Sequence, residues 1–370
     1  MQRKATALDV AKRAGVSRSA VSLVLNGRGD GNVAKESQDR IRRAAVELSY
    51  SPNPIALSLR NQRTRMIGIV SDHVVVSAFD GNIIGGADDV ARSRGFVTVA
   101  MDTEFDAARD ESAVETLLDR QVDGLIYVTE GLKPLDVPPG MLRVPSVLAN
   151  CYDNAPVPAL PHMIPDEVRG GREATNHLLE LGHRDIALLA GAAGSAAAPL
   201  RVAGYREAFA EARLDVREDW MSWVGWDIDG GFHGAMKLLD GVSPAERPTA
   251  IMCANDRAAI GVALAAARLG LSVPGDLSIM GYDDESHVAD TMVPTLTTMA
   301  LPLREMGAAA MTALLAQIEG PGKSEGHGKS EGPGIPVGPG ISENGRAASL
   351  ETLAPCRLVI RESTGPAAHR

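Results

Sequence analysis

Hydrophobic residues near the start of the chain recur at helical spacing and predict two short helices joined by a tight turn. In the stretch DVAKRAGVSRSAVSLVLNG (9–27), Val10 and Ala14 lie four residues apart and so share one face of a first helix. Gly15 follows, and glycine readily adopts the positive φ that ends a helix and turns the chain. Ser17 then precedes the second helical run, where its hydroxyl can accept a hydrogen bond from an early N–H group.

The second helix has a small apolar face and an opposite face on which a leucine stands among polar residues. At about 100° per residue, Ala20, Val21, Val24 and Leu25 fall on one side and Ser19, Ser22, Leu23 and Asn26 on the other, with Arg18 at the edge. This arrangement is the outline of a helix-turn-helix, whose second helix enters the major groove of DNA. There Leu23 could contact a thymine methyl group, and Arg18 and the serines could hydrogen-bond to bases or phosphates. The alternative is a small helical hairpin with one leucine exposed to water.

Residues 34–50 predict a third helix, after which prolines interrupt the helical pattern. Pro52 and Pro54 break any continuing helix. Residues 55–60 could form one more short helix, but a helix of that length is unstable alone. Such a segment is typical of a linker that becomes ordered only on binding.

From Met66 onward, short apolar runs alternate with helical stretches, which predicts parallel sheets covered by helices on both faces. The apolar runs that predict strands are 66–70, 96–100, 123–128, 145–149, 185–191, 249–254 and 277–283. The stretches that predict helices lie near 83–94, 110–121, 167–181, 201–213, 229–240 and 256–269. The two blocks of alternation predict two similar lobes. Ligands of open parallel sheets bind beyond the carboxyl ends of the strands, so we expect a binding cleft between the lobes.

One stretch fits neither lobe. Residues 320–346 are rich in glycine and proline, contain no aromatic residue and repeat GKSEG at 322–326 and 328–332. Such a composition is typical of a flexible insert. We therefore interpret His327, within it, as a solvated residue rather than a metal ligand.

The length and the charge distribution separate a basic head from an acidic body. A chain of 370 residues suggests two or three domains of ~150 residues each. Residues 1–65 hold 13 Lys and Arg against 5 Asp and Glu, an excess of eight positive charges. The rest of the chain holds 24 against 42, an excess of eighteen negative charges. A basic module on an acidic body is typical of nucleic-acid binding.

The cysteines and the apolar runs predict a cytoplasmic protein. Cys151, Cys253 and Cys356 are odd in number and scattered, so we expect reduced thiols that fill small spaces in the core. No apolar run approaches the ~20 residues that a membrane span needs, so no membrane partner is expected. The basic start is not followed by the apolar segment of a secretory signal.

The familiar sequence motifs of enzymes are missing. The chain has no GxxxxGK[ST] or HExxH motif, and His177 and His183 are six residues apart, too far for a metal pair on one helix face. Residues 283–285 (DDE) could supply carboxylates for acid–base chemistry or a metal. No nucleophile and base accompany them, so we expect a binding protein without cofactor or metal rather than an enzyme.

Several strings in combination resemble the LacI/GalR-type transcriptional repressors. They are DVAKRAGVSRSAVSLVLNG, LSYSPNPIALSLR, HLLELGHRDIALLAG, CANDRAAIGVALAAARLGLSVPGDLSIMGYDD, PTLTTMALPLREMG and RLVIREST. They occur in the family's order from Thr6 to about Thr364, and the insert at 320–346 is the clear departure. The resemblance implies an all-α helix-turn-helix head, a hinge helix and a two-lobed α/β core similar to type I periplasmic binding proteins. It also implies a homodimer on a pseudo-palindromic operator.

The family's chain crosses three times between its core lobes, which assigns segments to domains here. They are 1–50 for the DNA-binding head, 51–62 for the hinge, 63–160 and 293–320 for the N-terminal lobe, 161–292 and 350–364 for the C-terminal lobe, and 320–346 for the insert.

The resemblance also assigns DNA-binding residues. The recognition positions of the family fall on Arg18, Ser19 and Leu23, with Ser17, Ser22 and Asn26 nearby for phosphates. Many relatives carry arginine where this chain has Leu23, so a guanine contact is absent here and the operator preference differs. The family's wedge leucine, which kinks DNA from the minor groove, falls on Leu59, with Ala56 one turn before it. The alternative for Leu59 is packing on its partner hinge or on the core.

The effector positions of the family fall between the lobes. They are Arg201, Asn255 and Asp283 for polar groups, Trp226 for stacking on a sugar ring, Asn150 between the lobes and, on weaker grounds, Phe79 on the opposite wall. Amides and charged groups bind hydroxyls, and an aromatic ring covers the apolar face of a sugar. We keep Asp256 as a structural residue at a helix start, and Trp220 and Trp223 as packing or surface residues. The resemblance implies a sugar-responsive repressor. The alternatives are a sugar-binding protein without a DNA role and a sugar-converting enzyme.

Overall fold

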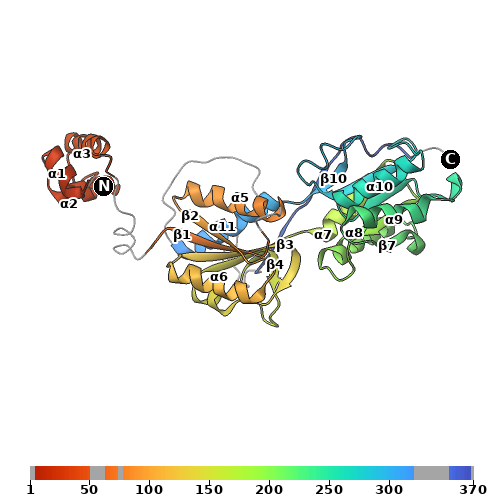
Figure 1. The fold of residues 1–370 in the computed structure, drawn as a ribbon, viewed down its shortest axis with the longest axis horizontal. Coiled ribbons are helices and arrows are strands. Elements are labelled where there is room, and N and C mark those ends of the chain that lie inside the picture. Colours follow the sequence, from red (N-terminus) through yellow and green to blue (C-terminus); the bar gives the residue numbers. More distant parts are fainter. Residues whose placement is uncertain (1–4, 51–62, 74–77, 321–349, 368–370) are drawn as a thin grey trace. The chain divides into compact units, whose positions relative to one another are not determined.

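The computed structural model describes residues 5–50, 63–73, 78–320 and 350–367 (Figure 1). These residues fall into two compact units, divided between Arg65 and Met66. The expected hinge, with Ala56 and Leu59, lies outside the described residues, as does the insert after Gly320.

The first unit is a head of three helices, as the sequence predicts. They are α1 (Ala7–Ala14), α2 (Arg18–Leu25) and α3 (Lys35–Glu47). Thr6 begins α1 with a capping box, in which its hydroxyl accepts from the Asp9 amide and the Asp9 carboxylate accepts from the Thr6 amide. Gly15 ends α1 with a φ of 65°, the left-handed conformation expected of the turn residue.

The head has an apolar core of its own. Val10, Val21 and Ile41, one from each helix, are almost completely buried there, and the aliphatic side chain of Leu25 packs against them. Each helix contacts both of the others. Short aliphatic residues at helical spacing thus give a unit that folds around its own centre.

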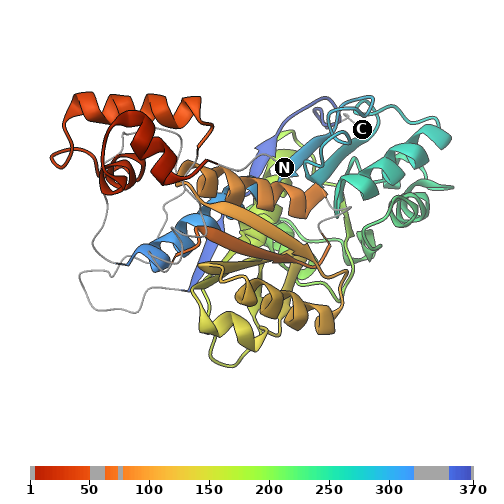
Figure 2. The ribbon, with the colours of Figure 1, turned by 60° about the vertical axis from the view of Figure 1, so that its left-hand side comes forward.

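The second unit contains two lobes, and the first is a parallel sheet between helices. Its six strands lie in the order β11 (Glu351–Ala354), β5 (His162–Pro165), β4 (Ser146–Asp153), β3 (Gly124–Leu135), β1 (Met66–Ser71) and β2 (Val97–Asp102). Its helices are α5 (Ala78–Ser93), α6 (Ala107–Asp119) and α11 (Leu303–Glu319). Helices α5 and α11 pack together on one face and α6 covers the other (Figure 1, Figure 2). An apolar cluster fills the space on each side of the sheet.

The second lobe repeats this plan. Its strands lie in the order β12 (Arg357–Val359), β10 (Thr297–Ala300), β9 (Ser278–Asp283), β8 (Ala250–Cys253), β6 (Ile186–Ala190) and β7 (Met221–Trp223). Only β12 runs antiparallel to its neighbour. Helices α7 (Glu167–Glu180) and α8 (Ala197–Glu211) pack as one pair, and α9 (Ile228–Leu239) and α10 (Asp256–Arg268) as another. These observations confirm the expected fold class.

The chain passes between the lobes three times, at positions that differ from the expected boundaries. Residues 162–165 form β5, which pairs with β4, so the first lobe extends five residues beyond the boundary expected at 160. Residues 297–300 pair with β9 in the second lobe, not the first, and residues 351–354 pair with β5 in the first lobe, not the second. The membership of such short strands is decided by hydrogen bonds to distant neighbours rather than by local pattern.

All three cysteines, Cys151, Cys253 and Cys356, are free and buried, as expected of residues that fill core space. Within the described residues, no helix combines the length and the hydropathy needed to cross a membrane.

Candidate functional site

The start and the end of α2 are fixed by side chains that the sequence assigns to DNA binding. The Ser17 hydroxyl accepts a hydrogen bond of 3.1 Å from the Ala20 amide and so caps the helix. At the other end, the Asn26 amide donates to the Ser22 carbonyl at 2.6 Å and to the Ser22 hydroxyl at 3.2 Å. Ser17, Ser22 and Asn26 therefore hold the helix ends in the free protein.

Arg18 and Ser19 point away from the core of the head and are exposed. Leu23 is partly buried and thus less exposed than the leucine predicted on the polar face of this helix. It is nevertheless absent from the side chains that pack on the described core of the head, which include Leu25 two residues later. The first two turns of α2 thus present an arginine, a serine and a partly exposed leucine on one surface.

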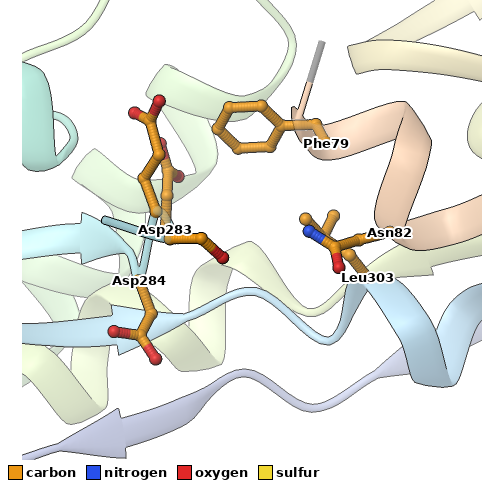
Figure 3. A pocket seen from close by; sticks show the side chains of 7 residues that line it. Phe79, Asn82, Asp283, Asp284 and Leu303 are labelled. Carbon is orange, nitrogen blue, oxygen red and sulfur yellow. The ribbon is translucent and has the colours of Figure 1, made fainter. Parts of the chain in front are cut away.

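A pocket in the second unit brings together residues from three elements (Figure 3). Phe79 and Asn82 come from α5, Leu303 from the start of α11, and residues 283–286 from the end of β9. In Figure 3, Phe79 and Asn82 face Asp283 across the opening. The pocket holds about 210 Å³ when the space open to solvent is included. Polar groups converging beside an aromatic ring are typical of small-molecule sites.

Arg201 of α8 lies behind this pocket, 6% exposed and surrounded by partners. Its Nε and Nη2 each donate a hydrogen bond of 2.9 Å to Glu167, and its Nη1 donates to the Ala254 carbonyl at 2.6 Å. The same Nη1 lies 3.4 Å from Asp283. Its Cζ is 3.7 Å from the centre of the Tyr282 ring, a cation–π contact. Arg201 thus joins α7, α8 and the ends of β8 and β9.

Burial and neighbouring charges shift the pKa values of Arg201 and Asp283 in opposite directions. Burial lowers the pKa of Arg201, but the charges of Glu167 and Asp283 outweigh burial and raise it above its ordinary value. Burial raises the pKa of Asp283 well above its ordinary value, and the charge of Arg201 offsets only part of this effect. The arginine is therefore held charged, and the aspartate protonates more readily than one in water.

Asp256, at the start of α10, connects strand β10 to the loop that follows β9. Its carboxyl group accepts from the Thr298 hydroxyl at 2.6 Å and from the Glu285 amide at 2.7 Å. Burial raises its pKa to about 7, and these two hydrogen bonds offset part of the rise. Asp256 does structural work, as expected, but by linking strand and loop, since the helix cap is Asn255.

Asn255 fixes the position of Trp226 rather than standing free. Its Oδ1 accepts from the Ala258 amide at 2.8 Å, and its Nδ2 donates to the Trp226 carbonyl at 3.0 Å. The indole ring lies against Gly191, where any side chain would collide with it, and 5.5 Å from the Arg201 guanidinium. The structure thus brings Asn255, Trp226, Arg201 and Asp283 together in the second lobe.

Asn150 lies apart from this group. It follows the apolar part of β4 with a φ of 61°, and its amide donates to the Thr129 and Glu130 carbonyls at 2.9 and 3.2 Å. It is buried and does not line the pocket with Phe79. Its observed contacts join β3 to β4 inside the first lobe.

Sequence reasoning missed the partners of these residues. Glu167, the first residue of α7, gives no local signal beyond an acidic residue in the sequence PDE, because its partner Arg201 lies 34 residues away. Asn82 lies one helical turn after Phe79 and could have been found by that spacing on a predicted helix.

A second polar group lies at the carboxyl ends of the first lobe's strands. The Ser71 hydroxyl donates to Asp80 at 2.6 Å, and Lys133 forms an ion pair of 2.6 Å with Asp72. Burial raises the pKa of Asp80 to about 7, the Ser71 bond offsets part of this, and the charges of Asp72 and Glu130 add to the rise. This is the edge at which parallel sheets bind ligands.

Among the described residues, neither the pair His177 and His183 nor the acidic residues 283–285 belong to a group that could hold a metal ion. His177 bonds to the Thr364 hydroxyl at 2.9 Å, and His183 bonds to Thr249 and Ser278 at 2.8 and 3.1 Å. Both histidines connect elements of the second lobe.

Two family models match this chain. The model described as bacterial regulatory proteins, lacI family, matches residues 6–53, and that of a periplasmic binding protein-like domain matches residues 175–335. The HTH-type transcriptional regulator DegA of Bacillus subtilis is 32% identical over 366 residues, which are 98% of this chain and 99% of DegA. The chain belongs to the LacI family. The ribose operon repressor of Escherichia coli is 34% identical over 86% of this chain and 94% of its own.

Solved structures of LacI-family regulators share the fold. The lac repressor dimer bound to operator and the anti-inducer ONPF has a TM-score of 0.72 and 27% identity, covering 98% of this chain and all of its own. The complex of the regulator CelR with cellobiose has a TM-score of 0.62 and 28% identity, covering 97% and 99%. As a LacI-family member, the chain is a DNA-binding transcriptional regulator with an effector-binding core.

Proposed function

We propose that this LacI-family chain is a cytoplasmic repressor whose operator affinity is controlled by a sugar bound in the core. The observation that carries this proposal is the pocket in which Phe79 and Asn82 of one lobe face Asp283 of the other. A ligand seated there contacts both lobes and so stabilises one arrangement of them over another.

The DNA half of the proposal rests on the surface of α2. Arg18 and Ser19 are exposed and Leu23 partly so, and they are proposed to contact base edges, with Ser17, Ser22 and Asn26 contributing phosphate contacts. Ala56 and Leu59 are proposed to enter the minor groove at the operator centre. A homodimer on a pseudo-palindromic operator is proposed with them, supported by the dimeric state of the lac repressor in its operator complex.

The sugar half rests on the chemistry around the pocket. Carboxyl and amide groups hydrogen-bond to hydroxyls, and the Phe79 ring offers an apolar wall. Arg201 and Asn255 are proposed to shape the site, with Trp226 as a stacking surface and Asn150 as a support between strands. The names of the ribose operon repressor and of the CelR–cellobiose complex favour a sugar.

A transport binding protein and a sugar-converting enzyme are the competing functions. Neither explains a separately folded helix-turn-helix head, and the relatives compared above are regulators. Incubating the purified protein with candidate sugars, followed by product analysis, separates the enzyme from the regulator, since a regulator returns each sugar unchanged.

The proposal is tested by combining a ligand screen with DNA selection. A thermal-shift screen of sugars should find one that raises the melting temperature, because a ligand of the native state stabilises it. Selection from random DNA should yield a pseudo-palindromic site, and the sugar should change affinity for it. A sugar that binds without any effect on DNA affinity would contradict the proposed control.

A further inference from the structure

The positive charges around the pocket are already paired within the protein. Three nitrogens of Arg201 are engaged, two by the carboxylate of Glu167 and the third by the Ala254 carbonyl and Asp283. A bidentate arginine–carboxylate pair is among the strongest in proteins, so a ligand anion must compete with it for the guanidinium. Arg201 is therefore not available as an anion receptor.

Other cations of this region are paired with carboxylates as well. Arg257 donates from Nε and Nη2 to Glu285, at 2.9 and 2.7 Å, and Glu285 lines the pocket. The Nζ of Lys133 lies 2.6 Å from Asp72 in the first lobe. The Nη2 of Arg361 donates to Asp284, a further lining residue, at 2.7 Å, so each of these basic side chains has a carboxylate partner.

The pocket itself is lined by three carboxyl groups, those of Asp283, Asp284 and Glu285, and none of its described lining residues is basic. The pKa of Arg257 is raised first by its bonds to Glu285 and also by the charge of Glu130, which acts on Asp80 as well. Glu130 of the first lobe therefore acts on a cation of the second lobe.

We propose that Glu167, by neutralising Arg201, makes the cleft selective for uncharged polyhydroxylated ligands and excludes phosphorylated or carboxylated ones. Hydroxyl groups donate readily to carboxyl oxygens such as those of Asp284 and Glu285, which line the pocket, whereas a phosphate meets like charge there. Glu167 is buried and does not line the pocket, so it is a positioning residue that acts through Arg201. This inference rests on the proposed effector site and names its ligand class.

The first test uses inorganic phosphate as an anionic probe, with potassium chloride at matched ionic strength as the reference. Wild-type protein should show no phosphate-specific rise in melting temperature. Glu167→Gln keeps the shape of the side chain but releases the charge of Arg201, so it should bind phosphate at least about tenfold more tightly than wild type. Glu207→Gln is the matched control, because Glu207 pairs with Arg172 on the surface of the same lobe, and it should gain no phosphate affinity.

The second test compares ribose with ribose 5-phosphate, and glucose with glucose 6-phosphate, on the wild-type chain. Stabilisation by a sugar phosphate above that of its parent sugar overturns the inference, and so does a folded Glu167→Gln protein without phosphate affinity. If Glu167→Gln does not fold, Asp283→Asn carries the same expectation, because it also removes a carboxyl partner of Arg201. If a broad panel of neutral sugars and sugar phosphates leaves the wild type unchanged, the proposed sugar effector fails, while the phosphate measurement still decides the role of Glu167.

Discussion

At the scale of single residues, the surroundings of a charged side chain decide what it can bind. Arg201 occupies the position that the family resemblance assigns to effector recognition, yet its guanidinium is held by Glu167 and faces Tyr282. The sequence identified the arginine but not its partner, because a contact between residues 34 positions apart leaves no periodic trace. The residue types of a site can thus be predicted while their availability cannot.

Leu23 is the residue by which this head should differ most from relatives with arginine at that position. Leu23→Ala should relax base preference at one position of each half-site, at a cost of about 1–3 kcal/mol, since it removes a methyl contact. The salt dependence of binding should stay unchanged because no charge is lost. Binding-site selection and titrations at several salt concentrations measure both.

The control for this experiment lies two residues away. Leu25 packs on the core of the head, so Leu25→Ala should lower the head's melting temperature, whereas Leu23→Ala should change it little. If Leu23→Ala unfolds the head, or if it keeps the full wild-type preference, Leu23 is an ordinary packing residue.

Asp256 should make the core less stable as the pH rises through the acid range. Folding raises its pKa from 3.8 to about 7, so the folded chain holds a proton that the unfolded chain has released between these values. The contribution of Asp256 to the free energy of unfolding is therefore largest at low pH. It falls between pH 4 and 7 by about 1.4 kcal/mol per pH unit at most and stays constant above pH 7. Asp256→Asn should remove this part of the fall, as measured by urea unfolding at several pH values.

Asp80 contributes a parallel fall, because burial raises its pKa to about 7 as well, so the Asp256→Asn protein should keep part of the slope. Asp276→Asn is a suitable control, since the hydrogen bonds from Ser272 lower the pKa of that exposed carboxylate. Its slope between pH 4 and 7 should match the wild type. An Asp256→Asn slope equal to the wild type would show that Asp256 is ionised throughout.

At the scale of elements, the sequence predicted those strands that have a strong local pattern of apolar residues. The expected strands were those that follow apolar runs, namely β1, β2, β3, β4, β6, β8 and β9. The missed strands have three or four residues each and are β5, β7, β10, β11 and β12. Each mixes polar with apolar residues and is too short to show a period, whereas the four residues of β8 are all apolar. They decide where the chain crosses between the lobes, so the boundaries were the least accurate part of the prediction.

Helix pairing gives a test at this scale. Gly204 of α8 meets the backbone of α7 so closely that an added Cβ would collide with the Val168 carbonyl. Gly204→Ala should therefore lower the stability of the core by about 1–3 kcal/mol, as in other overpacked sites. Gly81→Ala in α5 is the matched control, since its Cβ meets nothing, and should raise stability by about 0.5–1 kcal/mol. Equal effects in urea unfolding would mean that α7 and α8 separate at little cost.

At the scale of the whole molecule, two units with separate apolar cores must be coupled for the proposed control to work. The fully buried side chains in the core of the head come from α1, α2 and α3, and the core lobes have clusters of their own. Each unit can therefore fold without the other. Coupling then depends on the linker of residues 51–62, which lies outside the described residues.

Because the two units have separate cores, the coupling between sugar binding and operator binding can be measured as a thermodynamic cycle. If a sugar changes operator affinity by some factor, operator DNA must change sugar affinity by the same factor, because the two bindings share one cycle. Calorimetry of the sugar with and without operator should reproduce the factor found by DNA titration, about 5–150-fold for a typical coupling of 1–3 kcal/mol. Protein lacking residues 1–62 should bind the sugar with the affinity of free full-length protein and should ignore operator DNA. Specific operator binding by that truncated chain, or unequal factors in the intact protein, would show that the head and the sugar site are not linked as proposed.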